Sequence, residues 1–135
     1  MAEPSDPDEA AVLAANQAFY DAFERCDPAA MRAVWDDAAD VVCTHPGWPL
    51  LRGIEDVADS WARLLANGQR LQFILTDVAV VVCGDAAWVT LDENLLAGDG
   101  SSGTVAAVNV FRRAGSGSPW RLVVHQGTSV LRTLG

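Results

Sequence analysis

The sequence contains only two histidines, and His45 stands where an apolar run meets a turn. The run VVCT precedes it and the turn PGWP follows it. An unperturbed imidazole has a pKa of about 6.5, so a neutral histidine can accept a proton near neutral pH. A strand end beside such a turn is where the wall of a pocket would meet its mouth. We therefore predict that His45 is a general base, the alternative being a structural histidine hydrogen-bonded by the turn or by Asp40.

Asn109 is a second candidate, because it interrupts the apolar segment AAVNVFRR. Strand alternation groups its side chain with three apolar ones, namely Val105, Ala107 and Phe111. A buried amide needs hydrogen-bond partners. Asn109 is therefore predicted either to contact a ligand or to bridge neighbouring strands.

Glu93 lies in the middle of three consecutive polar residues, Asp92, Glu93 and Asn94, inside a strand-like segment. At least one of the three must face inward unless the strand contains a bulge. The AGDGSSG segment that follows allows either pairing parity. Glu93 is the stronger candidate for the interior and Asp92 the weaker one, and the sequence leaves open which of them faces inward.

His125 follows the apolar run WRLVV. Strict alternation opposes it to Trp120, Leu122 and Val124, so if these three point inward, His125 lies on the outer face and Gln126 points into the interior. His45, His125 and Glu93 lack the local spacing typical of metal ligands, and no metal site is expected.

Three predicted helices must position these groups. Asp6-Pro7 and Asp27-Pro28 each predict a helix start, because an aspartate caps the first turn and proline suits the first helical position. A third helix follows Gly53 and is predicted to stop at Asn67-Gly68. Aromatic residues on the apolar helix faces, expected mainly in the core, are Phe19, Trp35 and Trp61. Trp48 differs, since its Pro-Gly-Trp-Pro turn is hard to bury, and we predict that it covers the mouth of a cavity.

The remaining elements are predicted strands. Residues 40–44 form a short β-branched run, and four longer runs follow from Leu71 onward, separated by CGD, AGDGSSG and AGSGSP. Such short gaps require antiparallel neighbours. Helices followed by a meander predict an α+β fold in which one curved, mostly antiparallel sheet packs on three N-terminal helices. The length of the chain predicts a single domain over residues 1–135.

Composition limits the partners. The chain has 135 residues and a formal net charge of −9, without a single lysine. This charge would repel phosphate backbones and anionic lipid surfaces, so neither nucleic acid nor membrane is an expected partner. The three cysteines have no disulfide or zinc spacing, and the N-terminus lacks the pattern of a signal peptide. We expect a cytoplasmic protein, and no nucleotide- or phosphate-binding loop suggests a cofactor.

Several segments, in their order, resemble a known superfamily: FYDAFERCDPAAMRAVWDDAADVV, the HPG turn, LRGIEDVADSW, VNVFRR and WRLVVHQGTS. From about Glu9 to Val130 the chain resembles the nuclear transport factor 2-like superfamily, within it the SnoaL-like branch that also includes ketosteroid isomerase. The resemblance implies a cone-shaped α+β barrel whose mouth opens between the helices and the concave sheet. It also implies a homodimer through the convex face.

Ketosteroid isomerase allows the most detailed comparison, because its three catalytic positions can be matched to residues of this sequence. His45 takes the place of its general-base aspartate, allowing one inserted residue, and Asn109 takes the place of its protonated aspartate. Phe19 replaces its oxyanion tyrosine, with Tyr20 about 100° away around the helix. Steroid isomerisation is therefore not expected. The amide of Asn109 could still donate to a carbonyl or oxyanion, and Glu93, at a position often acidic in SnoaL-like relatives, could orient His45 or act as an acid.

The resulting hypothesis is a cone pocket that binds a small, largely apolar or aromatic molecule carrying a carbonyl or hydroxyl group. His45, Asn109 and Glu93 are its predicted catalytic residues, and the predicted lining is Phe19, Trp35, Trp48, Trp61 and Gln126. Cofactor-free proton transfer of the isomerase, cyclase or hydratase type is the expected chemistry. The alternative is a non-catalytic dimeric ligand-binding or assembly module, because this fold serves many functions.

Overall fold

A computed structural model describes residues 6–67 and 70–131. Three helices and six strands follow one another along the chain. The helices are α1 (Pro7–Glu24), α2 (Pro28–Val34) and α3 (Ile54–Ala66). The strands are β1 (Val42–Thr44), β2 (Leu51–Arg52), β3 (Leu71–Cys83), β4 (Ala86–Ala97), β5 (Ser102–Arg112) and β6 (Arg121–Ser129).

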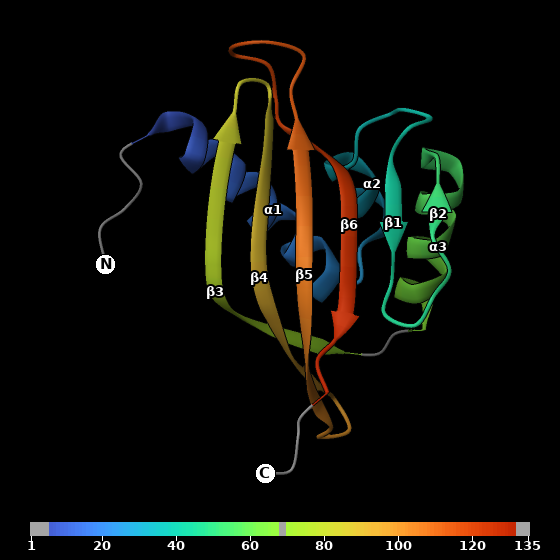
Figure 1. Cartoon of the computed structure of the whole chain (residues 1–135). Coiled ribbons are helices and arrows are strands. Elements are labelled where there is room, and N and C mark those ends of the chain that lie inside the picture. The colour runs from blue at the N-terminus through green and yellow to red at the C-terminus, as the bar shows by residue number, and fades with distance from the viewer. Residues whose placement is uncertain (1–5, 68–69, 132–135) are drawn as a thin grey trace.

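The six strands form one sheet in the order β2-β1-β6-β5-β4-β3. Only β1 and β6 pair in parallel, and the other neighbours are antiparallel. The sheet faces the viewer in Figure 1, with α1 and α2 behind it and α3 beside the short strands. The predicted α+β architecture and the four-stranded meander are confirmed, whereas the two-residue strand β2 was not predicted.

The helix starts arise from local side-chain hydrogen bonds. Asp6 Oδ1 accepts the backbone N–H of Asp8 at 2.8 Å, and Asp27 Oδ1 accepts that of Ala30 at 3.0 Å. Both aspartates thus satisfy a backbone donor that the first helical turn leaves unpaired. At the end of α3, Asn67 is the capping residue, and the predicted stop at Gly68 lies outside the described residues.

A β-bulge in β6 decides which residues of that strand face the helices. Phe111 of β5 pairs with Leu122, whereas the preceding Val110 pairs with Val124, so Val123 is an extra residue. One extra residue reverses the alternation beyond it. His125 is consequently buried and Gln126 is exposed on the outer face, so the sequence-based prediction for these two residues was wrong.

The core fills the space between the helices and the concave face of the sheet. Residues of α1, β4, β5 and β6 pack there with exposures close to zero, among them Phe19, Val89, Phe111 and Leu122. Within the described part of the chain, no helix is both long and apolar enough to cross a membrane.

Candidate functional site

Five polar side chains meet inside this core and form what we call the polar cluster. They come from α1, β4, β5 and β6, and each is at most 3% exposed: Asn16, Tyr20, Glu93, Asn109 and His125. Strand pairing sets Asn109 directly opposite His125. The structure therefore brings three neighbouring strands and one helix face to a single buried polar site.

The amide of Asn109 connects the members of the polar cluster. Its Nδ2 donates to Asn16 Oδ1 at 2.9 Å and to the Tyr20 hydroxyl at 3.1 Å, and its Oδ1 lies 2.6 Å from His125 Nδ1. Both amide hydrogens are thereby used within the protein. The predicted donation from Asn109 to a ligand is not what this geometry provides, because Asn109 holds Tyr20 and His125 instead.

Glu93 and Tyr20 form the shortest hydrogen bond of the cluster. The Tyr20 hydroxyl donates to Glu93 Oε2 at 2.5 Å. Burial raises the pKa of Glu93 to about 7, an effect that the Tyr20 hydrogen bond partly opposes. Burial, reinforced by Glu93, also raises the pKa of Tyr20 well above its usual range. Glu93 can therefore gain or lose a proton near neutral pH while Tyr20 stays protonated.

His125 is a neutral ring whose tautomer follows from its partner. Burial lowers its pKa to about 3, with a smaller contribution from His45. Since Asn109 Oδ1 can only accept, His125 must donate from Nδ1. Its Nε2 consequently carries the lone pair.

His45 lies outside the polar cluster but close to it. It directly follows β1, is 3% exposed, and its Nε2 is 2.9 Å from the Ser60 hydroxyl oxygen of α3. Ser60 donates its only hydroxyl proton to the carbonyl of Val57 at 2.7 Å. The imidazole must therefore donate from Nε2, which leaves the lone pair on Nδ1, and burial lowers the pKa of His45 to about 4. Asp40, the other partner considered for His45, is instead bound by Arg112.

Replacing Ser60 with alanine is expected to release the tautomer of His45 and to cost about 1 kcal/mol of stability, the usual value of a lost hydrogen bond. Long-range proton–nitrogen NMR of the imidazoles separates the two tautomers. We expect Nε2–H at His45 and Nδ1–H at His125 in the wild type, and a mixed population at His45 alone in Ser60→Ala. Ser101→Ala, at an exposed turn, is the control. A wild-type His45 protonated at Nδ1 would contradict the assignment.

Aromatic side chains surround the two histidines. The Trp61 ring lies 4.6 Å from His45 and 5.8 Å from His125, and Phe19 lies 4.8 Å from His125, measured between ring centroids. Trp48 is 38% exposed and meets His45 edge-on at 4.9 Å. Among the described residues, the buried indole N–H groups of Trp35 and Trp61 have no oxygen or nitrogen acceptor, and that of Trp61 interacts with the thiol of Cys43.

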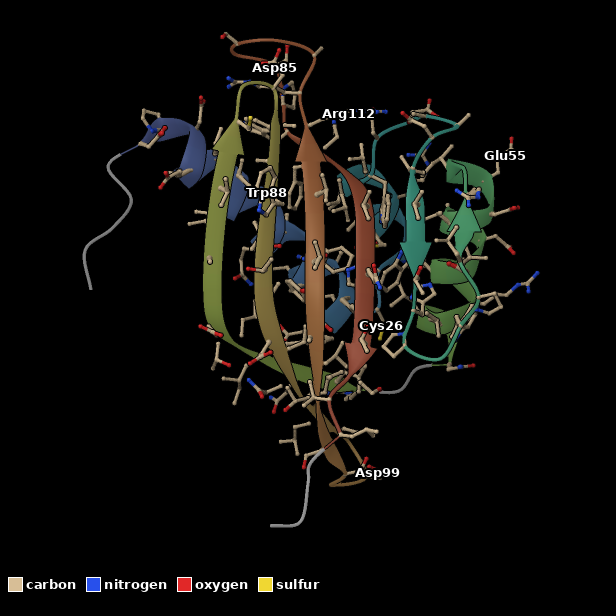
Figure 2. All side chains as sticks on the ribbon, viewed as in Figure 1. Cys26, Glu55, Asp85, Trp88, Asp99 and Arg112 are labelled. Carbon is tan, nitrogen blue, oxygen red and sulfur yellow. The ribbon has the colours of Figure 1, made fainter. Side chains whose placement is uncertain are left out.

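The other predicted lining residues lie elsewhere. Trp35 is buried and bridges to Leu122 near the start of β6. Gln126 lines a hollow of about 380 Å³ on the outer face of the sheet. Trp88 of β4 faces the same outer side and is 39% exposed (Figure 2).

Three residues of the site were missed from the sequence. Tyr20 is buried beside Phe19, although the helical angle suggested that it would point away. Asn16 and Ser60 carried a usable signal, because each is a polar residue at an apolar position of its helix. A polar side chain at a core position of an amphipathic helix indicates a buried hydrogen-bond network.

Comparisons with known proteins agree with this fold. Residues 12–132 match the model of the SnoaL-like domain, and the chain therefore belongs to the SnoaL-like family. It is similar to a putative dehydratase of the NTF2-like family from Streptomyces avermitilis, with 42% identity, a TM-score of 0.85, and coverage of 96% of this chain and 100% of that one. A search of curated proteins found no match.

Two further solved structures are informative. A putative calcium/calmodulin-dependent protein kinase type II association domain from Thiobacillus denitrificans is 32% identical, with a TM-score of 0.76 over 88% of this chain and 94% of that one. A ketosteroid isomerase-like protein from Erwinia carotovora atroseptica has 19% identity and a TM-score of 0.68, over 94% of this chain and 99% of that one. The latter supports the fold alone.

Proposed function

We propose that this protein catalyses cofactor-free proton transfer on a small, largely apolar molecule that carries a carbonyl or hydroxyl group. The observation that carries the proposal is the buried Glu93 carboxyl, whose pKa of about 7 and hydrogen bond to Tyr20 suit an acid that works near neutral pH. The similarity to the dehydratase-like protein from Streptomyces avermitilis supports the same class of reaction.

The roles follow from the hydrogen bonds. His45 Nδ1 is the general base that removes a proton next to a carbonyl. When Glu93 is protonated, it donates to the Tyr20 oxygen, and the Tyr20 hydroxyl proton is then free to be donated to the developing oxyanion. In a dehydration, the C–H and C–O bonds break, a double bond forms, and protonated Glu93 supplies the proton with which the hydroxyl leaves as water. Asn109 is a positioning residue, because it touches Tyr20 and His125 rather than the reacting atoms.

Apolar rings provide the remaining contacts of the proposed site. Phe19 and Trp61 form its wall, and Trp48, partly exposed and packed on His45, is the side chain that must move to admit a ligand. A mainly apolar site with a few polar groups favours a neutral ligand over a charged one.

Deuterium exchange tests the proposed chemistry directly. Cyclohexanone and acetophenone are incubated with the protein in D₂O and the loss of their α-proton signals is followed by NMR, while diacetone alcohol tests dehydration. We expect exchange above the buffer rate in wild type and in the neighbouring control Asp92→Asn. Absence of exchange, dehydration and ligand-induced thermal stabilisation would refute the proposal.

The second candidate is a non-catalytic dimeric binding or assembly module. It is favoured by exposed apolar side chains on the outer face of the sheet, among them Ile74, Val81, Trp88 and Val108, and by the similarity to an association domain. A dimer through this face would cover them.

Replacing Val108 with glutamate is expected to convert this dimer to a monomer. Val108 is 39% exposed on β5, and a charge buried at the centre of an apolar interface costs several kcal/mol. Molar mass from light scattering measures the outcome. Val130→Glu, an exposed valine beyond β6, should leave the mass unchanged. A wild-type monomer, or a dimeric Val108→Glu variant, would contradict the proposed interface.

A further inference from the structure

Two arginines differ from most others in this acidic protein. Within the described residues, Arg32, Arg63, Arg112 and Arg113 each form an ion pair with aspartate, and Arg121 donates to the carbonyl of Ala33. No ion pair in this part of the chain involves Arg25, Arg52 or Arg70. Arg52 lines a hollow with Asp37, Glu55 and Asp56, whereas the acidic residue described around Arg25 and Arg70 is Glu24.

Both arginines line the same surface hollow. It has a volume of about 830 Å³ and lies between the end of α1, the start of β3 and the end of β4. Asp99, which follows the lining residue Gly98, marks this end of the sheet at the bottom of Figure 2. The remaining wall is largely apolar, with Leu71, Leu96 and Ala97.

The frame of the hollow is fixed by hydrogen bonds. The backbone N–H of Gly98 donates to the carbonyl of Arg70 at 2.9 Å, and that of Phe73 donates to Glu24 Oε2 at 2.8 Å. Among the described residues that line the hollow, Glu24 is the only acidic one, and this bond directs it to the strand edge. The two arginine charges therefore exceed the single carboxylate charge around the hollow.

We propose that this hollow binds a small organic carboxylate with a hydrocarbon body. A guanidinium fork matches the two oxygens of a carboxylate, and two such groups can hold one anion. The apolar wall suits the hydrocarbon portion. A monoanion is favoured over a polyphosphate, because the net charge of −9 repels highly charged anions. This site is separate from the polar cluster, since none of the cluster residues lines it.

Titration with hexanoate tests the proposal, with hexanamide as the uncharged counterpart. Backbone amide shifts in proton–nitrogen spectra should move at residues 70–72 and 96–98 with hexanoate and not with hexanamide. In the double variant Arg25→Gln/Arg70→Gln we expect the affinity to fall at least about tenfold, as for the loss of charge-assisted hydrogen bonds. Both side chains are exposed, so the variant should fold.

Arg52→Gln is the matched control. Arg52 is also exposed but shares its hollow with Asp37, Glu55 and Asp56, and its removal should leave hexanoate binding unchanged. Equal affinity of the double variant and the wild type, or equal binding of hexanamide, would overturn the proposal. Shifts centred on Tyr20 and Glu93 would also overturn it, by assigning the carboxylate to the polar cluster. None of these results depends on catalytic turnover.

Discussion

Replacing Glu93 with glutamine is expected to lower the rate of ketone α-proton exchange by about 10²- to 10⁴-fold, the range typical of a lost general acid or base. Glutamine keeps the size of the side chain and an oxygen that can accept from Tyr20, so the buried hydrogen bond can persist. What it removes is the titrating proton. A lower exchange rate in this variant would therefore reflect the loss of proton transfer by Glu93 rather than a disrupted structure of the site.

The same variant should change how stability depends on pH. The pKa of Glu93 is raised from 4.5 to about 7 in the folded protein, so the native state binds more protons than the unfolded state between these values. Stability contributed by the protonated group is lost as the pH rises through this interval, by about 3 kcal/mol in total. Glu93→Gln should remove this loss and be the more stable protein at pH values above about 8.

Urea unfolding across pH, combined with the exchange assay, measures both effects. Asp92→Asn is the control, because Asp92 is adjacent but points to the other face of β4 and lines the outer hollow. It should change neither property. Unreduced exchange in Glu93→Gln would remove Glu93 from the mechanism, and an unchanged pH profile would show that its carboxyl titrates normally.

Replacing Asn109 with alanine is expected to give the largest loss of stability, at least about 3 kcal/mol. The change leaves the Asn16 amide oxygen and the Nδ1–H of His125 without this partner, and it removes one of the two hydrogen bonds of the Tyr20 hydroxyl. Each unsatisfied buried group costs about 1 to 3 kcal/mol, and a cavity adds to this. The tautomer of His125 should also become mixed.

Chemical denaturation and imidazole NMR test this prediction together. Asn94→Ala is the matched control, because the Asn94 amide bonds Ile74, Thr76 and Thr104 on the partly exposed outer side of the sheet, where water can replace it. We expect a loss there of less than about 1 kcal/mol. Similar losses for both variants would mean that Asn109 is an ordinary strand residue.

The sequence predicted the elements well because their signals are local. Each Asp-Pro pair caps its helix within three residues, and the short gaps after β3, β4 and β5 leave no alternative to antiparallel pairing. Alternation grouped Asn109 with Val105, Ala107 and Phe111, and all four are buried, because β5 is regular at these residues. It could not decide between Asp92 and Glu93, because either pairing parity was open; the structure places Glu93 inside.

Longer-range geometry accounts for the errors. Tyr20 is buried because α1 contacts both β3 and β4, so that a wider arc of the helix than one apolar stripe is covered. The bulge at Val123 is not marked by any residue type, since valine is as common in regular strands. The hydrogen bond between Ser60 and His45 depends on how α3 packs beside β1. The spacing of residues within either element does not reveal this packing.

The extra residue in β6 has an evolutionary consequence. In a strand with a β-bulge, the even-numbered residues face inward on one side of the bulge and the odd-numbered residues face inward on the other side. If β6 kept the same residues but paired regularly through Val123, Gln126 would face the helices and His125 the outer face without any substitution at either position. The gain or loss of a bulge in this strand can thus exchange an imidazole for an amide on the inner face of the sheet, which gives related proteins a short route between different internal chemistries.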